Sequence, residues 1–131
     1  MSLFRMKAAV LAGLLLALTP GAALAHGAAD PQYGGTVATA NDLSFELVSG
    51  ADGATIYVSD HDQPYDATGL SGKLTVLSGT EKTEAPIAPI GENKLEAKGI
   101  AVPDGAKSVA TLKTADGKTI TVRFNVPSHD P

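Results

Sequence analysis

Apolar and polar residues alternate along several short stretches of the chain, and this alternation limits the possible fold more than any other feature. It is clearest in KTITVRFNV, where Ile120, Val122, Phe124 and Val126 alternate with polar residues. Successive side chains of a strand point to opposite faces, so this stretch predicts a strand with one buried face. LSFELV, ATIYVSD and GKLTVLSG follow the same pattern. The alternation predicts an antiparallel all-β domain.

Residues typical of turns separate these stretches. Asp116-Gly117 lies between AKSVATLK and KTITVRFNV, and suits a turn with positive φ, so these two stretches should form a hairpin. Weaker strands are expected at 36–40, 82–87 and 94–98. Seven or eight strands spaced about ten residues apart favour a small immunoglobulin-like antiparallel β-sandwich over a closed barrel or an α/β fold.

The first 25 residues have the pattern of a secretory signal peptide. Arg5 and Lys7 precede an apolar run at 8–18, and Ala23-Leu24-Ala25 offers small residues to a signal peptidase. A membrane anchor is the alternative, but the run is shorter than the roughly 20 residues needed to cross a bilayer. We therefore expect a periplasmic protein, without membrane insertion after the signal is cleaved.

Cleavage after Ala25 would leave 106 of the 131 residues, enough for one domain. We expect a flexible mature N-terminus at 26–34, the β-sandwich domain at 35–127 and a C-terminal tail at 128–131. Loss of two basic residues leaves eight against fourteen acidic ones, a net charge of −6. This balance argues against nucleic acid or an anionic membrane surface as a partner.

The position of His26 directly after the expected cleavage site would give it two metal ligands. Cleavage frees its α-amine, which can close a six-membered chelate ring with the imidazole Nδ1 on one metal ion. The amine titrates near about 8 and the imidazole near about 6.5, so a metal can displace both protons at neutral pH. With a third imidazole, these nitrogens form the tetragonal site that Cu(II) prefers, while Zn(II) or Ni(II) match it less well.

Two other histidines could supply the third ligand. His61 lies just past the expected end of a strand in SDHDQPYD, between Asp60 and Asp62, and His129 lies in VPSHDP at the C-terminus. We favour His61, because chain ends are commonly frayed. Each histidine also has an interpretation without a metal. His26 would then belong to a flexible leader, His61 to a solvated turn and His129 to a disordered tail.

Other chemistry finds little support in the sequence. The chain has no cysteine, and both methionines lie in the expected signal peptide, so the mature chain has no sulfur ligand for a soft Cu(I) site. A nucleophile elbow, a phosphate-binding glycine loop and paired carboxylates are all missing. Tyr33, Tyr57 and Tyr65 are the only tyrosines, too few for the aromatic platform of an oxidative copper enzyme. We predict a binding protein, not an enzyme.

One segment recurs within the chain. ADGATIYV at 51–58 matches ADGKTITV at 115–122 at six of eight positions, and a His-Asp pair follows each within a few residues. Duplication of a turn-and-strand unit would explain this. Convergence explains it as well, because turns favour Asp-Gly and strands favour Thr, Ile and Val, and we prefer this explanation.

The motifs AHG, FELV and DHDQPYD resemble those of small exported proteobacterial proteins that accompany heavy-metal efflux and copper-resistance systems. A β-sandwich that begins with histidine is also similar to the CopC-type copper carriers, whose N-terminal histidine binds Cu(II) with a later Asp-x-His element. From this likeness only His26 carries over, because Asp60-His61-Asp62 lies in mid-chain. The resemblance implies a Cu(II) buffer or carrier that serves a heavy-metal efflux protein. The alternative is a metal-free interaction module that contacts an envelope or efflux-complex protein through Tyr57 and Tyr65.

Overall fold

The computed structural model describes residues 30–128, and these residues form strands, turns and loops without a helix. No helix of membrane-spanning length and hydropathy is found in this range. The all-β prediction is confirmed. The strands are β1 (Thr36–Ala40), β2 (Leu43–Gly50), β3 (Gly53–Asp60), β4 (Gln63–Pro64), β5 (Ser71–Ser78), β6 (Glu81–Gly91), β7 (Lys94–Lys98), β8 (Lys107–Lys113) and β9 (Thr119–Asn125).

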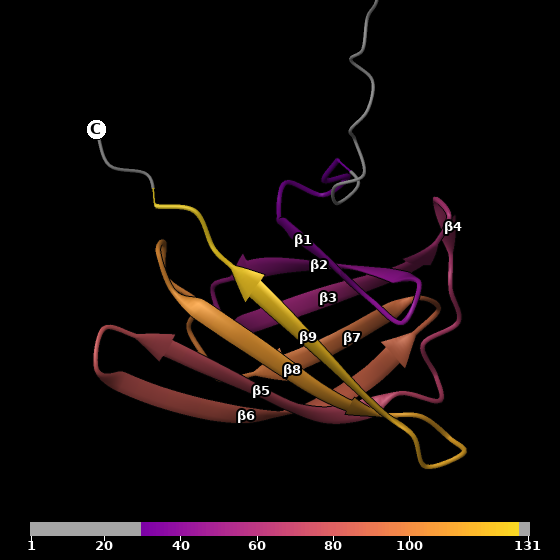
Figure 1. Ribbon diagram of the computed structural model, residues 1–131. Coiled ribbons are helices and arrows are strands. Elements are labelled where there is room, and N and C mark those ends of the chain that lie inside the picture. Colours follow the sequence, from indigo (N-terminus) through magenta and orange to yellow (C-terminus); the bar gives the residue numbers. More distant parts are fainter. Residues whose placement is uncertain (1–29, 129–131) are drawn as a thin grey trace, which may run out of the picture.

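The strands form one antiparallel sheet in the order β1-β2-β3-β7-β6-β5-β8-β9, and the two-residue β4 pairs with the end of β3 (Figure 1). Hairpins join β1 to β2, β2 to β3, β5 to β6, β6 to β7 and β8 to β9. The chain crosses from β3 to β5 and later returns from β7 to β8, which pairs with β5. This order is a Greek key, the usual connection of antiparallel β domains.

The sheet curls until β1 lies beside β9, which makes the molecule nearly barrel-shaped. Within residues 30–128 no ladder of hydrogen bonds joins these two strands, so the barrel is not fully closed. The expected division into the two sheets of an immunoglobulin-like sandwich is therefore not seen. Strand twist lets one continuous sheet wrap around a single core, and periodicity alone cannot distinguish this from two packed sheets.

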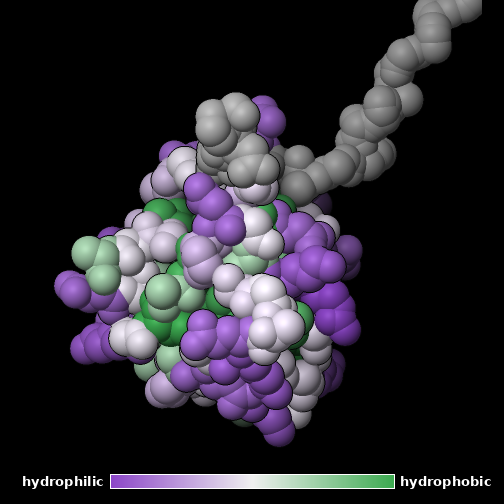
Figure 2. Space-filling model, turned by 90° about the vertical axis from the view of Figure 1, so that its left-hand side faces the viewer, coloured by the Kyte–Doolittle hydropathy of each residue, from purple (hydrophilic) through white to green (hydrophobic). Residues whose placement is uncertain are grey.

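The core is built from the apolar residues of the alternating stretches. Along β9 every second residue, Ile120, Val122 and Phe124, is buried, and the residues between them are exposed. Phe45 and Phe124 are the largest fully buried side chains. Figure 2 shows a face that is mostly hydrophilic, with apolar patches between the polar side chains. The alternation therefore identified the buried face of these strands.

Several local predictions are confirmed. The weak strand signals at Thr36–Ala40 and Lys94–Lys98 correspond to β1 and β7, with the predicted bounds. β8 and β9 form the expected hairpin, and Gly117 in its turn has a φ of 89°. Nine strands occur where seven or eight were expected, one of them the short β4.

Candidate functional site

The Asp60-His61-Asp62 element forms a tight turn at the end of β3. Asp60 pairs with Gln63, which leaves His61 and Asp62 as the two residues of a hairpin loop. Their φ angles are 52° and 69°, as a type I′ turn requires at both central positions. Histidine and aspartate are among the few residues other than glycine that adopt this backbone readily. The expected position of His61 just past a strand is confirmed.

The imidazole of His61 is already oriented by its neighbour. His61 Nδ1 lies 2.6 Å from Asp60 Oδ1, and the two side chains are 88% and 47% exposed. With Nδ1 engaged by the carboxylate, Nε2 is the ring nitrogen that this contact leaves available to a ligand. Metal-binding histidines commonly have such a carboxylate partner, which fixes the ring and its tautomer. Asp60 and His61 therefore fit a metal ligand and its supporting group.

The other carboxylate of this region, Asp66, has a structural role. The backbone N–H of Thr68 and its hydroxyl both donate to Asp66 Oδ1, at 3.0 and 2.8 Å. Both bonds hold the pKa of the Asp66 carboxyl below its ordinary value, and the bond from the backbone N–H has the larger effect. Asp66 therefore orders the chain between β4 and β5.

Two of the predicted ligands, His26 and His129, lie outside the described residues. Within 30–128 no three histidine, aspartate or glutamate side chains gather closely enough to hold a metal ion. The structure brings Asp60 and His61 together, with Asp62 beside them in the same turn.

Sequence reasoning did not anticipate the role of Glu46, which organises the amino-terminal part of the described chain. Glu46 lies in the middle of β2 and is only 6% exposed. Its Oε1 accepts the backbone N–H of Gln32, and its Oε2 accepts those of Tyr33 and Gly35, all at 2.8 Å. We call residues 30–35 the amino-terminal latch. The expectation of a flexible start at 26–34 did not include these contacts.

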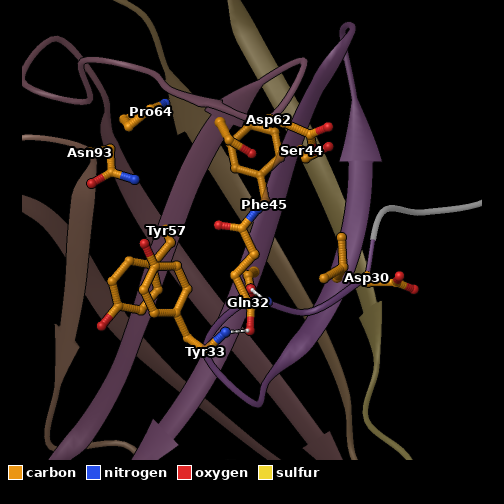
Figure 3. Close-up of a pocket in the computed structure, with 12 residues that line it drawn as sticks. Asp30, Gln32, Tyr33, Ser44, Phe45, Tyr57, Asp62, Pro64 and Asn93 are labelled. Atoms are coloured by element: carbon orange, nitrogen blue, oxygen red, sulfur yellow. Dashed lines mark hydrogen bonds between the residues drawn. The ribbon is translucent and has the colours of Figure 1, made fainter.

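Two further contacts hold the latch on the sheet. The ring of Tyr33 stacks on that of Tyr57 in β3, with centroids 3.8 Å apart and planes 11° from parallel (Figure 3). Gly35 approaches β2 so closely that a Cβ there would overlap the carbonyl oxygen of Leu47. The latch therefore spans from β2 to β3. Because Tyr33 covers Tyr57, Tyr65 is the better exposed of the two tyrosines expected for an interaction surface.

The latch leads back toward the β3–β4 turn. Asp30 at its start and Asp62 in the turn border the same surface cavity, together with Tyr33, Tyr57 and Asn93 (Figure 3). Its volume of about 40 Å³ is far below the roughly 300–1,000 Å³ of a typical organic ligand site. The cavity is therefore too small for an organic ligand.

The opposite end of the latch lies near the end of β9. Gly34 and Gly35 border a second cavity with Val126 and Pro127, and His129 follows Pro127 by two residues. The start of the latch, which is nearer to His26 in the sequence, shares its cavity with Asp62 of the β3–β4 turn.

The fold and the site define a small, nearly barrel-shaped Greek-key domain with an amino-terminal segment latched over its outer face. The chain matches no protein-family model, and no significant match was found among curated proteins or solved structures. The likeness to copper-resistance proteins rests on the short motifs alone.

Proposed function

We propose that this protein, exported to the periplasm and cleaved before His26, binds a divalent transition metal, most readily Cu(II). The α-amine and imidazole of His26 supply two nitrogens, and His61 supplies the third. Asp60 orients the ring of His61, and Asp62 is a weak ligand or an outer partner. Such a protein would buffer Cu(II) in heavy-metal resistance or carry it to an efflux protein.

The position of the latch is the observation that carries this proposal. Asp30 borders the same cavity as Asp62, and Asp30 is the fourth residue after His26. Four residues reach at most about 14 Å, so covalent geometry keeps an amine at His26 within about this distance of Asp30. The Asp60–His61 contact of 2.6 Å adds a second reason, because it leaves Nε2 of His61 to coordinate.

The geometry also favours His61 over His129 as the third ligand. Gly34 and Gly35 border the cavity next to Pro127, and they follow His26 by eight and nine positions in the sequence. The end next to the β3–β4 turn is Asp30, which is four residues from His26. The cost of closing a loop increases with its length, so the shorter connection is preferred.

The test compares two proteins, one that begins at His26 and one that carries a single additional alanine before it. The first should bind Cu(II) tightly, with the EPR signal of several coordinated nitrogens, and the second should lose this binding because its His26 has an amide in place of the amine. Mass spectrometry of the exported chain comes first, to establish that it begins at His26. Equal binding by both forms, or by neither, would contradict the amino-terminal site, and binding by neither would favour the metal-free interaction module.

Substitutions then assign the third ligand. His61→Asn keeps a residue that tolerates positive φ but removes the imidazole, and His129→Ala removes the other candidate. We expect His61→Asn to remove one nitrogen from the EPR spectrum and His129→Ala to leave the spectrum unchanged. The opposite result would move the third ligand to the C-terminal tail.

A further inference from the structure

The amino-terminal arm, which we define as the latch together with β1 (residues 30–40), is joined to the rest of the domain by one tight turn. Asn41 and Asp42 are the two loop residues of the β1–β2 hairpin, and both are exposed. The partners of the arm in β2, β3 and β9 all follow this turn in the sequence. Opening the turn would therefore separate the arm from its partners without changing any other connection.

The arm contributes little to the core. β1 lies at one edge of the sheet, where it pairs with β2, and within residues 30–128 no ladder joins it to β9 (Figure 1). Four of its five residues are half-buried, one is exposed and none is fully buried. Ala38 and Ala40 pack partly against the core. Detachment of the arm would therefore leave the fully buried side chains in place, because they all belong to other segments.

The surface that receives the arm matches this segment of chain. Glu46 offers both carboxylate oxygens to three backbone N–H groups of the latch, and Tyr57 offers its ring to Tyr33. β2 adds the hydrogen-bonded ladder along β1. A second copy of the chain carries the same arm and the same surface. The arm of one copy can therefore make all of these contacts with the other copy.

The turn that would act as the hinge is costly for the residues that form it. Asn41 and Asp42 have φ angles of 53° and 64°, as a type I′ turn requires. Left-handed backbone is unfavourable for residues other than glycine, and glycine is the usual second residue of such a turn. An extended connection would remove this cost. Short, strained hinge loops favour the exchange of elements between copies.

We propose that two copies of this protein exchange their amino-terminal arms and form a symmetric dimer. In the dimer, Asn41 and Asp42 are extended, β1 of each copy pairs with β2 of the other, and each latch binds Glu46 and Tyr57 of the other copy. Monomer and dimer share these contacts and differ mainly at the turn. The balance between them depends on protein concentration and on the strain in the turn. The copper site has no part in this exchange.

Two substitutions of Asp42 should shift this balance in opposite directions. Asp42→Pro prevents the closed turn, because proline fixes φ near about −65°, but it fits an extended hinge. Asp42→Gly removes the backbone cost of the closed turn. Both are made in the chain that begins at His26, which contains the complete arm. Asp62→Pro is the matched control, because Asp62 has a φ of 69° at the same position of the β3–β4 turn, which releases no terminal arm.

Analytical ultracentrifugation measures the dimer, with EDTA present so that no metal ion links two chains. We expect Asp42→Pro to be mainly dimeric at concentrations where the parent protein and Asp62→Pro are monomeric. Asp42→Gly should lower the association constant of the parent at least about fivefold, because each dimer opens two turns. An Asp42→Pro protein that is monomeric and has the circular dichroism spectrum of the parent would overturn the proposal.

A disulfide distinguishes arm exchange from contact between two closed copies. Thr39 in β1 pairs with Ser44 in β2, and opposite residues of antiparallel strands lie at a Cα distance that a disulfide spans. The chain has no cysteine of its own. Thr39→Cys with Ser44→Cys should therefore link the two chains of an Asp42→Pro dimer on a non-reducing gel, and should close within one chain in Asp62→Pro. An Asp42→Pro dimer with disulfides only within single chains would overturn arm exchange.

The cysteine pair also tests the protein with its natural turn, so the result does not depend on whether Asp42→Pro folds. The parent with this pair is refolded from urea over about a thousandfold range of concentration and then oxidised. The fraction of linked dimer should increase with concentration, because exchange requires two chains. Addition of Asp42→Gly should reduce this fraction. Disulfides that form only within single chains at every concentration would overturn the proposal.

Discussion

At the scale of single residues, the β3–β4 turn keeps two non-glycine residues at positive φ. Asp62, with a φ of 69°, has a counterpart in Asp42 of the β1–β2 turn, with a φ of 64°. We predict that Asp62→Gly raises the free energy of unfolding by up to about 1 kcal/mol, because left-handed backbone costs a non-glycine residue about 1–2 kcal/mol, and the freedom of glycine in the unfolded chain offsets part of this gain.

Asp42→Gly is the matched control for this prediction. It should raise the midpoint of urea unfolding by a similar amount, since both residues are second in a two-residue hairpin loop. If Asp62→Gly destabilises the protein while Asp42→Gly stabilises it, Asp62 makes a contribution to folding beyond its backbone conformation.

Asp66 gives a prediction of pH dependence. Its lowered pKa means that the folded protein holds the Asp66 proton more weakly than the unfolded chain does. The resulting stabilisation is present above about pH 4 and is lost as the pH falls through the lowered folded value. We predict that Thr68→Ala raises the pKa of Asp66 only part of the way to its ordinary value, since the backbone N–H remains. NMR titration of the Asp66 carboxyl carbon measures this shift, and Thr80→Ala in the β5–β6 turn should leave it unchanged.

At the scale of strands, β5 depends on a close approach at Gly72. This residue pairs with Ile87 in β6 and Leu112 in β8, and a Cβ there would overlap the carbonyl oxygen of Thr111. We predict that Gly72→Ala lowers the free energy of unfolding by about 1–3 kcal/mol, as is usual for overpacking. Gly69→Ala is the control, because its Cβ would meet Ala115 at an ordinary 3.5 Å. Equal midpoints of urea unfolding for the two variants would contradict this explanation.

Strand positions were predictable from sequence, but strand neighbours were not. Alternation located β1 and β7 because it is a local property of the chain. The pairing of β3 with β7 depends instead on contacts between residues far apart in sequence, such as Ile56 with Leu95, and no local pattern records them. The repeated segments at 51–58 and 115–122 are both a turn followed by a strand, in β3 and β9, which local turn and strand preferences explain.

The candidate site, like the fold, was predictable from the sequence only in part. The turn with His61 follows from a His-Asp pair at the end of an alternating stretch. The role of Glu46 could not be deduced in the same way, because a glutamate in an alternating strand normally faces water. Its burial results from the latch folding back over β2. The one available signal was the charged residue inside FELV.

At the scale of the whole molecule, the curled sheet places distant parts of the chain around the latch. Asp30 borders the same cavity as Asp62 of the β3–β4 turn, and Gly35 borders the same cavity as Pro127 after β9. The latch therefore shares one cavity with Asp62 of the β3–β4 turn and another with Val126 and Pro127, which are far from it in sequence. In the proposed site, the pairing of His26 with His61 would depend on the fold and would link copper binding to the folded state.

This dependence determines how copper should affect stability. In the proposed site, the amine and imidazole of His26 are neighbours in the unfolded chain too, so copper would bind the unfolded protein through these two nitrogens. Only coordination by His61 would then make the folded state bind copper more tightly than the unfolded state. If the third nitrogen increases the affinity about 100-fold, saturating Cu(II) stabilises the fold by about 2.7 kcal/mol and raises Tm on the order of 10 °C.

His61→Asn separates binding from stabilisation in this experiment. It should still bind Cu(II) through His26, yet the rise in Tm should disappear, because its folded and unfolded states then offer the same two nitrogens. The alanine-extended protein should neither bind tightly nor gain stability. A full rise in Tm for His61→Asn would mean that another group of the folded domain completes the copper site.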